Sequence, residues 1–327
     1  MAARGFVQVL QILTMASGYL PMPKTRSAYL CAPSIICSKA ARLLLKPPPV
    51  PDCRLRATEP TVTTTAGVGM LIRDAVNRGA KRIVLGLGGS ATNDCGVGMA
   101  SELDFRFLDK NNNSFVPVGG TLIEVEHIVA PKKTFCVPVV AACDVTNPLF
   151  GVDGAAYVFA PQKGADYMMV KDLDDGLKHY ASVIKRDVGV DVENLKGGGA
   201  AGGIAAGMVA FFNAKLTSGI DVMLDGTGFD SLLKDAAFVV TGEGKLDNQT
   251  LDGKAISGLT RHAKKFGVPV IAICGQIAMG FDLEKSGLAL ATATSPENTP
   301  LLPSRNYKQE LYDAAVKLFK NLLEKKS

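Results

Sequence analysis

The chain has 327 residues, a formal net charge of +5 and 20% charged residues. It contains no long block of like charges, no tryptophan and only 6% aromatic residues, which argues against a nucleic-acid partner. Seven cysteines without a Cys-x-x-Cys pair and three histidines without metal-ligand spacing argue against a disulfide framework and a zinc site. The composition is that of a soluble globular protein, with a length that suits about two domains.

Residues 1–60 form an atypical N-terminal segment. Before Asp52 it contains basic residues and no acidic residue, a bias typical of organelle transit peptides. Its apolar runs are too short to cross a bilayer, so no membrane partner is expected, and KPPPVP (46–51) is typical of a linker. We expect the segment to be either disordered or an artefact of the gene model. The expected location is cytoplasmic, or an organelle if the segment is a transit peptide.

Helix and strand patterns alternate from Thr61 onward. The first helix is expected in TTTAGVGMLIRDAVNRG (63–79), where threonines can cap the start and a glycine fits the end. Next come three apolar β runs, in KRIVLGLG, TFCVPVVAACDV and AAYVFA. A second helix is expected in residues 165–187, with Leu173, Leu177, Tyr180 and Ile184 on its apolar face. GGGAAGGIAAGMVAFF (197–212) then places a glycine cluster before a buried apolar helix.

Cleaner α/β units follow residue 228. The expected elements are strands in AAFVVTGEG, VPVIAICG and LALATA, a helix in 252–267, and a final helix in 306–325. The final helix is expected to bury Leu311, Ala315, Leu318 and Leu322. Strands that alternate with helices predict a parallel sheet covered on both faces, with ligands beyond the carboxyl ends of its strands.

Three polar, glycine-bearing loops follow apolar runs: GLGGSATND (86–94), ACDVTNP (142–148) and TGEGKLD (241–247). In the first, Gly86, Gly88 and Ala91 match the spacing of a dinucleotide loop, with Asp109 where a ribose-binding acid would lie. The polar insert SATND fits that motif poorly, and no Walker A sequence is present. An anion site or a plain turn remain as alternatives.

The second and third loops contain carboxylates. Asp144, or Glu243 and Asp247 on either side of Lys245, could bind Mg²⁺ or accept a proton from a substrate hydroxyl. Each acid could instead cap a helix or a turn. Lys163 and Lys254 could meet phosphate charge, or lie on the surface as most lysines do.

Four motifs follow one another in a fixed order: GGSATNDCGVGM, ACDVTNPLFGVDGAAYVFAPQKGA, GGGAAGGIAAG and VVTGEGKLDNQTLDGK. With them, residues 61–327 resemble the bacterial-type glycerate kinase family, which lacks a Walker A motif. The resemblance implies a phosphotransferase that phosphorylates D-glycerate with ATP, typically to 2-phosphoglycerate, with Mg²⁺ as a second cofactor. It also implies a homodimer as one candidate assembly.

The resemblance further implies an α/β fold with two domains and substrates in the cleft between them. Residues 61–228 would be an inserted mixed α/β domain with the glycine-rich site loops. Residues 229–327 would be the C-terminal part of a Rossmann-like parallel-sheet domain. The opening strand and D-S-F-K-G motif of the family are absent, so this sheet is expected to lack its N-terminal strands.

Site residues are implied by the same motifs. Asp94, Asp144 and Asp247 are the catalytic candidates, one of which would orient or deprotonate the glycerate 2-hydroxyl. Glu243 and Asp247 would hold Mg²⁺. The residues expected to bind substrate or phosphate are Gly88, Gly89, Ser90, Asn93, Asn147, Lys163, Gly198, Gly199 and Lys245.

Departures from the family pattern leave other functions open. Cys95 replaces a usual glycine, and Lys245 a usual arginine. A family remnant that binds a ligand or a partner without turnover is one alternative. An NAD(P)-dependent oxidoreductase, based on the Gly86-x-Gly88-x-x-Ala91 spacing, is a weaker one.

Overall fold

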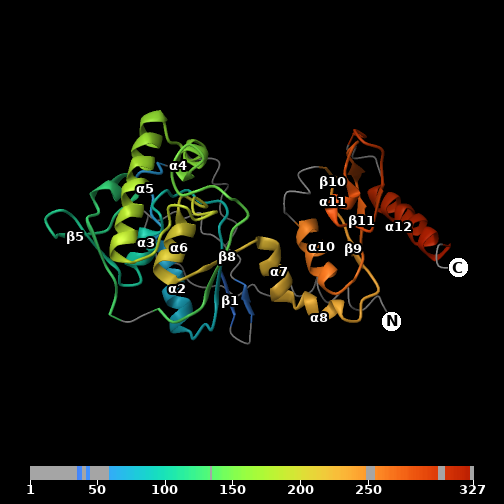
Figure 1. Ribbon diagram of the computed structural model, residues 1–327, viewed down its shortest axis with the longest axis horizontal. Coiled ribbons are helices and arrows are strands. Elements are labelled where there is room, and N and C mark those ends of the chain that lie inside the picture. Colours follow the sequence, from blue (N-terminus) through green and yellow to red (C-terminus); the bar gives the residue numbers. More distant parts are fainter. Residues whose placement is uncertain are drawn as a thin grey trace. The chain divides into compact units, whose positions relative to one another are not determined.

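The computed structural model describes residues 35–38, 42–44, 59–132, 135–247, 255–300 and 306–324. The chain divides into two compact units, Met1–Ser218 and Gly219–Ser327 (Figure 1). Each unit contains parallel strands and helices, which confirms the predicted α/β class. Most of the predicted N-terminal segment, residues 1–60, lies outside the described residues.

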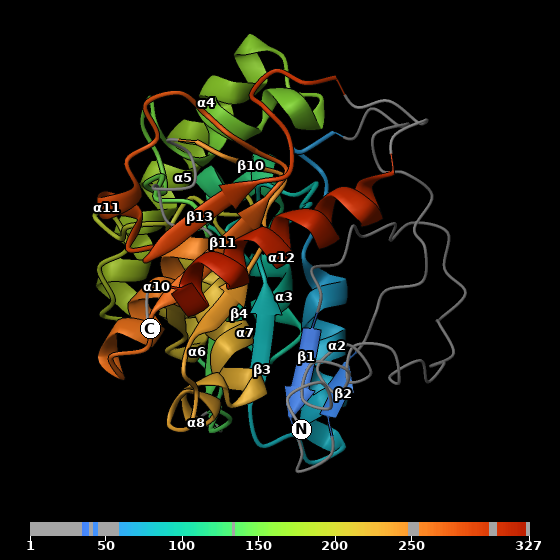
Figure 2. The ribbon, with the colours of Figure 1, turned by 90° about the vertical axis from the view of Figure 1, so that its right-hand side faces the viewer.

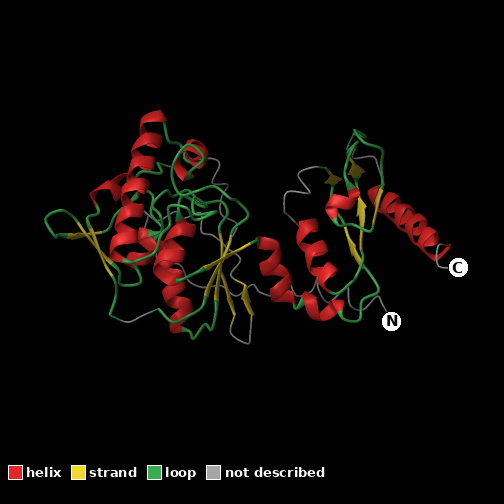
Figure 3. Cartoon of the chain, viewed as in Figure 1, coloured by secondary structure: helices red, strands yellow, loops and turns green. Residues whose placement is uncertain are grey.

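The main sheet of unit 1 has five strands in the order β2-β1-β3-β7-β8. Figure 3 draws the strands of both units in yellow and the helices in red. Their bounds are Arg42–Leu44, Ile35–Ser38, Ile83–Gly86, Val139–Ala142 and Lys215–Thr217. Strands β3, β7 and β8 run parallel, and β1 pairs with β2 and β3 in antiparallel fashion. Because β3 and β7 are parallel neighbours, the loops that follow them leave the same edge of the sheet.

Helices pack their predicted apolar faces into the core of unit 1. The helices are α2 (Ala66–Asn77), α3 (Val97–Ser101), α4 (Ala155–Phe159), α5 (Tyr167–Asp187) and α6 (Ile204–Phe212), with 3-10 turns η2 (Gly119–Glu124) and η3 (Pro161–Lys163). Four predicted core residues of α5 are fully buried: Leu173, Leu177, Tyr180 and Ile184. Helix α6 is buried along nearly its whole length, as its apolar sequence predicts.

The prediction of a strand in AAYVFA (155–160) is wrong, because these residues form α4. Ala155, Ala156 and Ala160 are buried, whereas Tyr157 and Val158 are exposed. This spacing is one face of a helix and not the alternation of a half-buried strand. Short apolar runs of this kind are ambiguous by periodicity alone, and alanine is the strongest helix former.

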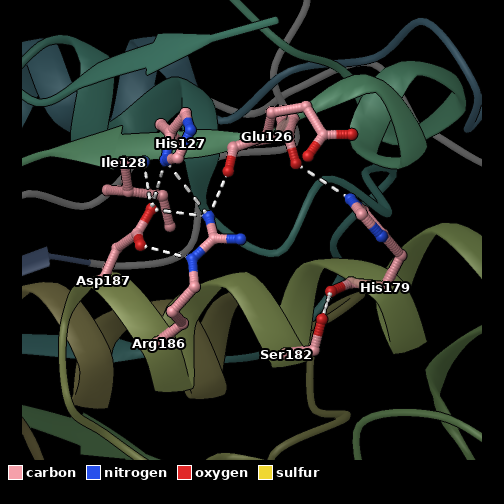
Figure 4. Close-up of polar contacts among 8 residues, drawn as sticks. Glu126, His127, Ile128, His179, Ser182, Arg186 and Asp187 are labelled. Atoms are coloured by element: carbon pink, nitrogen blue, oxygen red, sulfur yellow. Dashed lines mark hydrogen bonds and ion pairs between the residues drawn. The ribbon is translucent and has the colours of Figure 1, made fainter. Parts of the chain in front are cut away.

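A three-stranded antiparallel sheet, β5-β4-β6, completes unit 1. Its strands are Ser114–Phe115, Arg106–Leu108 and His127–Val129. Figure 4 shows how α5 is fixed along β6: Asp187 Oδ2 accepts a hydrogen bond from Ile128 N at 2.8 Å, and Arg186 donates to the Glu126 carbonyl. About two turns earlier, His179 Nε2 lies 2.9 Å from the Val125 carbonyl. Side chains from the C-terminal half of α5 therefore form hydrogen bonds with main-chain groups of residues 125–128, at the start of β6.

Unit 2 is built on the parallel sheet β13-β11-β9, beside a small parallel pair β10-β12. In chain order these strands are Val239–Thr241 (β9), Lys245–Leu246 (β10), Val270–Cys274 (β11), Gln276–Ile277 (β12) and Leu290–Ala293 (β13). The helices are α7 (Gly219–Thr227), α8 (Phe229–Leu233), α10 (Ala255–Lys265), α11 (Leu283–Ser286) and α12 (Tyr307–Glu324).

Alternate residues of β11 serve two hydrophobic clusters, one on each face of the sheet. Val270, Ala272 and Cys274 pack in a cluster that includes Ile256 and Ala263 of α10. Ile271 and Ile273 pack with Ala314 and Leu318 of α12, and Figure 2 shows α12 crossing β11 and β13. The sheet is thus covered on both faces, as predicted. Leu311 was expected on the buried face of α12 but is 49% exposed, because the contact with the sheet begins one turn later, at Ala314.

The observed division between the units falls ten residues before the predicted boundary at 228/229, so α7 belongs to unit 2. Asp221 of α7 accepts hydrogen bonds from Arg261 and, at 3.1 Å, pairs with His262 Nε2, both on α10. A Cβ at Gly258 would lie 2.5 Å from Ile220, so α7 and α10 approach closely. These contacts pack α7 against α10 within unit 2.

We expect Asp187→Ala to lower the free energy of unfolding by about 1–3 kcal/mol, because the N–H of Ile128 loses a charged acceptor. Asp172→Ala, at an exposed position of the same helix, should change it by less than about 0.5 kcal/mol. Urea unfolding of both variants measures the difference. Equal stabilities for the two variants would contradict the role given to Asp187.

Candidate functional site

Three loops of unit 1 are bonded to one another next to the carboxyl ends of β3 and β7. They comprise residues 87–96, 143–148 and 196–203. The strands stay in register up to this point, since Leu87 N donates to Ala142 O at 3.0 Å. The bonds that join the loops are Gly197 N to Thr146 O (3.2 Å), Gly199 N to Asn147 O (3.1 Å) and Cys95 N to Gly202 O (3.1 Å). We call these three segments the loop cluster.

Glycines allow main chain to pack against main chain in the loop cluster. Gly202 has φ +72°, and a Cβ there would lie 2.0 Å from the Thr92 carbonyl oxygen. At Gly199 a Cβ would lie 2.2 Å from Pro148 O. Gly198 and Gly199, expected to bind substrate or phosphate, are both buried. Their evident task in this structure is close packing, and their part in ligand binding stays a prediction.

Gly88 and Gly89 form the open part of the loop cluster. Both are exposed, and a Cβ at either position would have no atom within 4 Å. Gly89 has φ +67°, a conformation that glycine adopts without strain. Next to them, Ser90 Oγ is held by the Ala201 carbonyl at 3.2 Å and by Thr92 Oγ1 at 2.9 Å. The accessible main chain of this glycine pair is suited to binding an anion such as a phosphate.

Asp94 lies at the opposite, interior end of the same loop and has no exposed surface. Its carboxylate accepts hydrogen bonds from Thr65 N and Thr65 Oγ1, both at 2.8 Å, from Gly96 N at 3.2 Å and from Gly98 N at 3.4 Å. Burial raises the pKa of the Asp94 carboxyl, and these hydrogen bonds act in the opposite direction. In this conformation the carboxylate faces Thr65, Gly96 and Gly98, and its part in catalysis stays a prediction.

Lys163 and Asn93 are also interior. Lys163 is 6% exposed, and its Nζ donates to the Thr92 carbonyl oxygen at 2.7 Å. Burial lowers the pKa of the Lys163 ammonium to about 8, while the charge of Asp94 raises it. The side-chain amide of Asn93 is fully buried and has no hydrogen-bond partner in the part of the chain that the structure describes.

Asp144 is the predicted catalytic acid that unit 1 exposes. It follows β7 directly and lies in the loop whose main chain bonds the glycine cluster. Nearby, Asn147 Nδ2 donates to the Asp153 carbonyl at 2.8 Å, so this amide shapes the loop. Unit 1 thus presents the exposed carboxylate of Asp144 after β7 and the open glycine pair after β3, its parallel neighbour.

In unit 2, the predicted acidic loop follows β9. Glu243 and Lys245 are exposed and Asp247 is half-buried. Glu243 O accepts a hydrogen bond from Gly275 N at 3.1 Å, which joins the loop to the end of β11. The loop therefore lies at the carboxyl edge of the sheet, where ligand-binding loops of parallel sheets occur.

Glu297 is a residue that sequence reasoning missed. Its Oε1 lies 3.4 Å from Lys245 Nζ, and its Oε2 accepts a hydrogen bond from Met279 N at 2.7 Å. The available signal was its position in SPENTP, a polar stretch directly after the β13 run. Glu297 holds the charge of Lys245 near the loops that follow β9 and β11.

The described residues contain no group of three or more histidine, cysteine, aspartate or glutamate side chains that could hold a metal ion. A magnesium ion that keeps several waters and binds one or two carboxylates and phosphate oxygens does not need such a cage. The exposed acids fit this mode of binding. No helix among the described residues is long and apolar enough to cross a membrane.

Comparison with known proteins gives a consistent result. The model of the glycerate kinase family matches residues 51–323. A glycerate kinase of Halalkalibacterium halodurans is 45% identical over 226 residues, and the glycerate 2-kinase of Escherichia coli is 44% identical over 223 residues. The two alignments cover 68% and 67% of this chain.

A crystal structure from Salmonella typhimurium, assigned as glycerate kinase 2, superposes with a TM-score of 0.64 at 38% identity. The match covers 82% of this chain and 67% of that one. This chain spans 60% and 58% of the length of the two curated relatives.

Cys95 gives a test of the loop conformation, because it has φ +50° and is fully buried. We expect Cys95→Gly to be more stable than Cys95→Ala by about 1 kcal/mol, since only glycine adopts this conformation without strain. The control is Ala100→Gly in α3, where the glycine should instead cost about 1 kcal/mol relative to the native alanine. Chemical denaturation measures all three. A Cys95→Ala variant at least as stable as Cys95→Gly would contradict the observed backbone.

Lys163 gives a pH test. Between about pH 8 and 10.5 the unfolded chain binds the proton that the folded protein has lost, so unfolding free energy rises with pH across this window. Below pH 8 this contribution is lost. Relative to Lys163→Met, the native protein should gain up to about 3 kcal/mol between pH 7.5 and 10.5. Urea unfolding across this range measures it, with Lys171→Met as the exposed control. A pH dependence unchanged by Lys163→Met would refute the buried ammonium.

Proposed function

The chain belongs to the glycerate kinase family, and on this premise we propose that it phosphorylates D-glycerate with ATP to give 2-phosphoglycerate. The observation that carries the proposal is the pairing of an open glycine main chain after β3 with the exposed carboxylate of Asp144 after β7, its parallel neighbour. Phosphoryl transfer needs donors for phosphate oxygens and an acceptor for the hydroxyl proton. The loop cluster of unit 1 offers both.

Asp144 is the proposed proton acceptor for the glycerate 2-hydroxyl. It is exposed, whereas the carboxylate of Asp94 is buried and accepts four hydrogen bonds. The main-chain N–H groups of Gly88 and Gly89 are the proposed phosphate donors, since both glycines are exposed among the described residues and a Cβ at either would have no described atom within 4 Å. Asp94 becomes a support for the loop in this proposal and not a group that touches substrate.

The charged loop of unit 2 takes its roles in the proposal from the sequence motifs. ATP would supply the phosphoryl group, and Mg²⁺ would offset the negative charge of its phosphates. Glu243 and Asp247 are the carboxylates proposed to hold Mg²⁺, because they flank an exposed loop at the carboxyl edge of the parallel sheet. Lys245 is the proposed phosphate cation, oriented by Glu297.

The oxidoreductase alternative has little geometric support. In a dinucleotide loop the helix starts within the glycine motif, but here α3 begins at Val97, well after β3 ends at Gly86. Asp109, the expected ribose acid, instead accepts hydrogen bonds from Asn111 N and Asn113 N in its own turn.

A ligand-binding family remnant without turnover is the second candidate. A homodimer and a cytoplasmic or organellar location stay predictions from the sequence, as do the inserted and Rossmann-like assignments of the two domains.

We expect ADP release to depend on D-glycerate in a coupled assay of the full chain. Asp144→Asn should lower kcat/KM by about 100-fold or more, because an amide cannot accept the hydroxyl proton. The control, Asp109→Asn, alters a remote turn acid and should keep kcat/KM within about twofold.

Two results would count against the proposal. ADP release from the native chain at background level would favour the remnant. Full activity of Asp144→Asn would remove Asp144 from the reaction while leaving the family activity in place.

A further inference from the structure

Lys163 contacts the glycine-rich loop, residues 87–96, from the protein interior. It ends the short turn η3, which follows α4, and its side chain is almost completely buried. Its Nζ donates to the carbonyl oxygen of Thr92 at 2.7 Å, a link between residues 71 positions apart in sequence. Gly202 lies next to the same carbonyl oxygen: a Cβ on Gly202 would be only 2.0 Å from it. This carbonyl oxygen therefore accepts a hydrogen bond from an ammonium and packs closely against Gly202.

The direction of this carbonyl fixes the direction of the next N–H. A peptide group is planar and trans, so the carbonyl of Thr92 and the N–H of Asn93 point to opposite sides of the chain. The side chain of Asn93 forms no hydrogen bond in the described structure that could hold the peptide from the other side. The ammonium of Lys163 is thus the charged group that keeps this peptide from rotating.

A packing role alone does not account for a lysine at this position. A buried ammonium is costly unless it is partnered, and burial lowers the pKa of Lys163 to about 8. A methionine of similar length would fill the same space without a charge. The charged bond to Thr92 and the nearby carboxylate of Asp94 are what the lysine adds.

We propose that Lys163 is a positioning residue: through the Thr92 carbonyl it sets the orientation of the Thr92–Asn93 peptide, and so the set of N–H groups that residues 88–93 offer to a phosphate. That the phosphate belongs to ATP rests on the proposed function. Lys163 does not itself contact the phosphate in this arrangement, because its ammonium faces the interior side of the loop.

Hydrogen exchange of the ligand-free chain tests the proposal without any activity. In Lys163→Met, amides of residues 88–96 should exchange about tenfold faster or more, because a hydrogen bond from a charged group is lost. Lys163→Arg should restore most of the protection, since a guanidinium can donate to the same carbonyl. Lys171→Met is the exposed control and should leave exchange in the loop unchanged. If Lys163→Met does not fold, Lys163→Leu, which also lacks a donor, replaces it.

Calorimetric binding of ATP provides the second measurement. We expect the affinity of Lys163→Met to fall about tenfold and that of Lys163→Arg to stay within about threefold of the native value. Unchanged exchange in Lys163→Met would overturn the proposal, as would weakened ATP binding without faster exchange, which would mark a direct phosphate contact. A native chain that does not bind ATP would refute the proposed function, while the exchange result still decides the role of Lys163.

Discussion

The buried carboxylate of Asp94 is the interaction on which the architecture of unit 1 depends. It joins the start of α2, through Thr65, to the turn that begins α3, through Gly96 and Gly98. The Thr65 hydroxyl also accepts a hydrogen bond from Met99 N, which adds a second link between the starts of α2 and α3. A charge removed from water is stable only when several donors meet it. Three of the four donors are main-chain N–H groups and the fourth is the Thr65 hydroxyl, so the path of the loop is fixed around the carboxylate.

The same loop extends from the buried Asp94 to its exposed end at Gly88 and Gly89. Lys163 holds the middle of the loop at Thr92, and the glycine cluster around Gly202 closes against it. Rigid support on one side and accessible main chain on the other are what a preorganised phosphate site requires. In the proposed chemistry, the buried carboxylate of Asp94 supports the loop, and the exposed main chain of Gly88 and Gly89 binds the phosphate.

Periodicity in the sequence was sufficient to predict the faces of α2 and α5, the strands β3, β7 and β11, and the three polar loops at strand ends. It failed for AAYVFA, where small residues suit a helix or a strand equally well. It also could not show which acid of a polar loop turns inward: Asp94 and Asp144 are alike in sequence context, but only Asp94 meets the N–H groups of α2 and α3. The contacts of Lys163 and Glu297 could not be predicted for the same reason, since their partners lie far away in sequence.

The proposed function requires that this chain transfers a phosphoryl group to the 2-hydroxyl of glycerate. Phosphorus NMR of the full chain with ATP, magnesium and D-glycerate follows the transferred group itself and separates transfer from simple hydrolysis. We expect a phosphomonoester signal of 2-phosphoglycerate that grows in step with ADP. Release of inorganic phosphate alone, or an ATP spectrum that does not change, would contradict it.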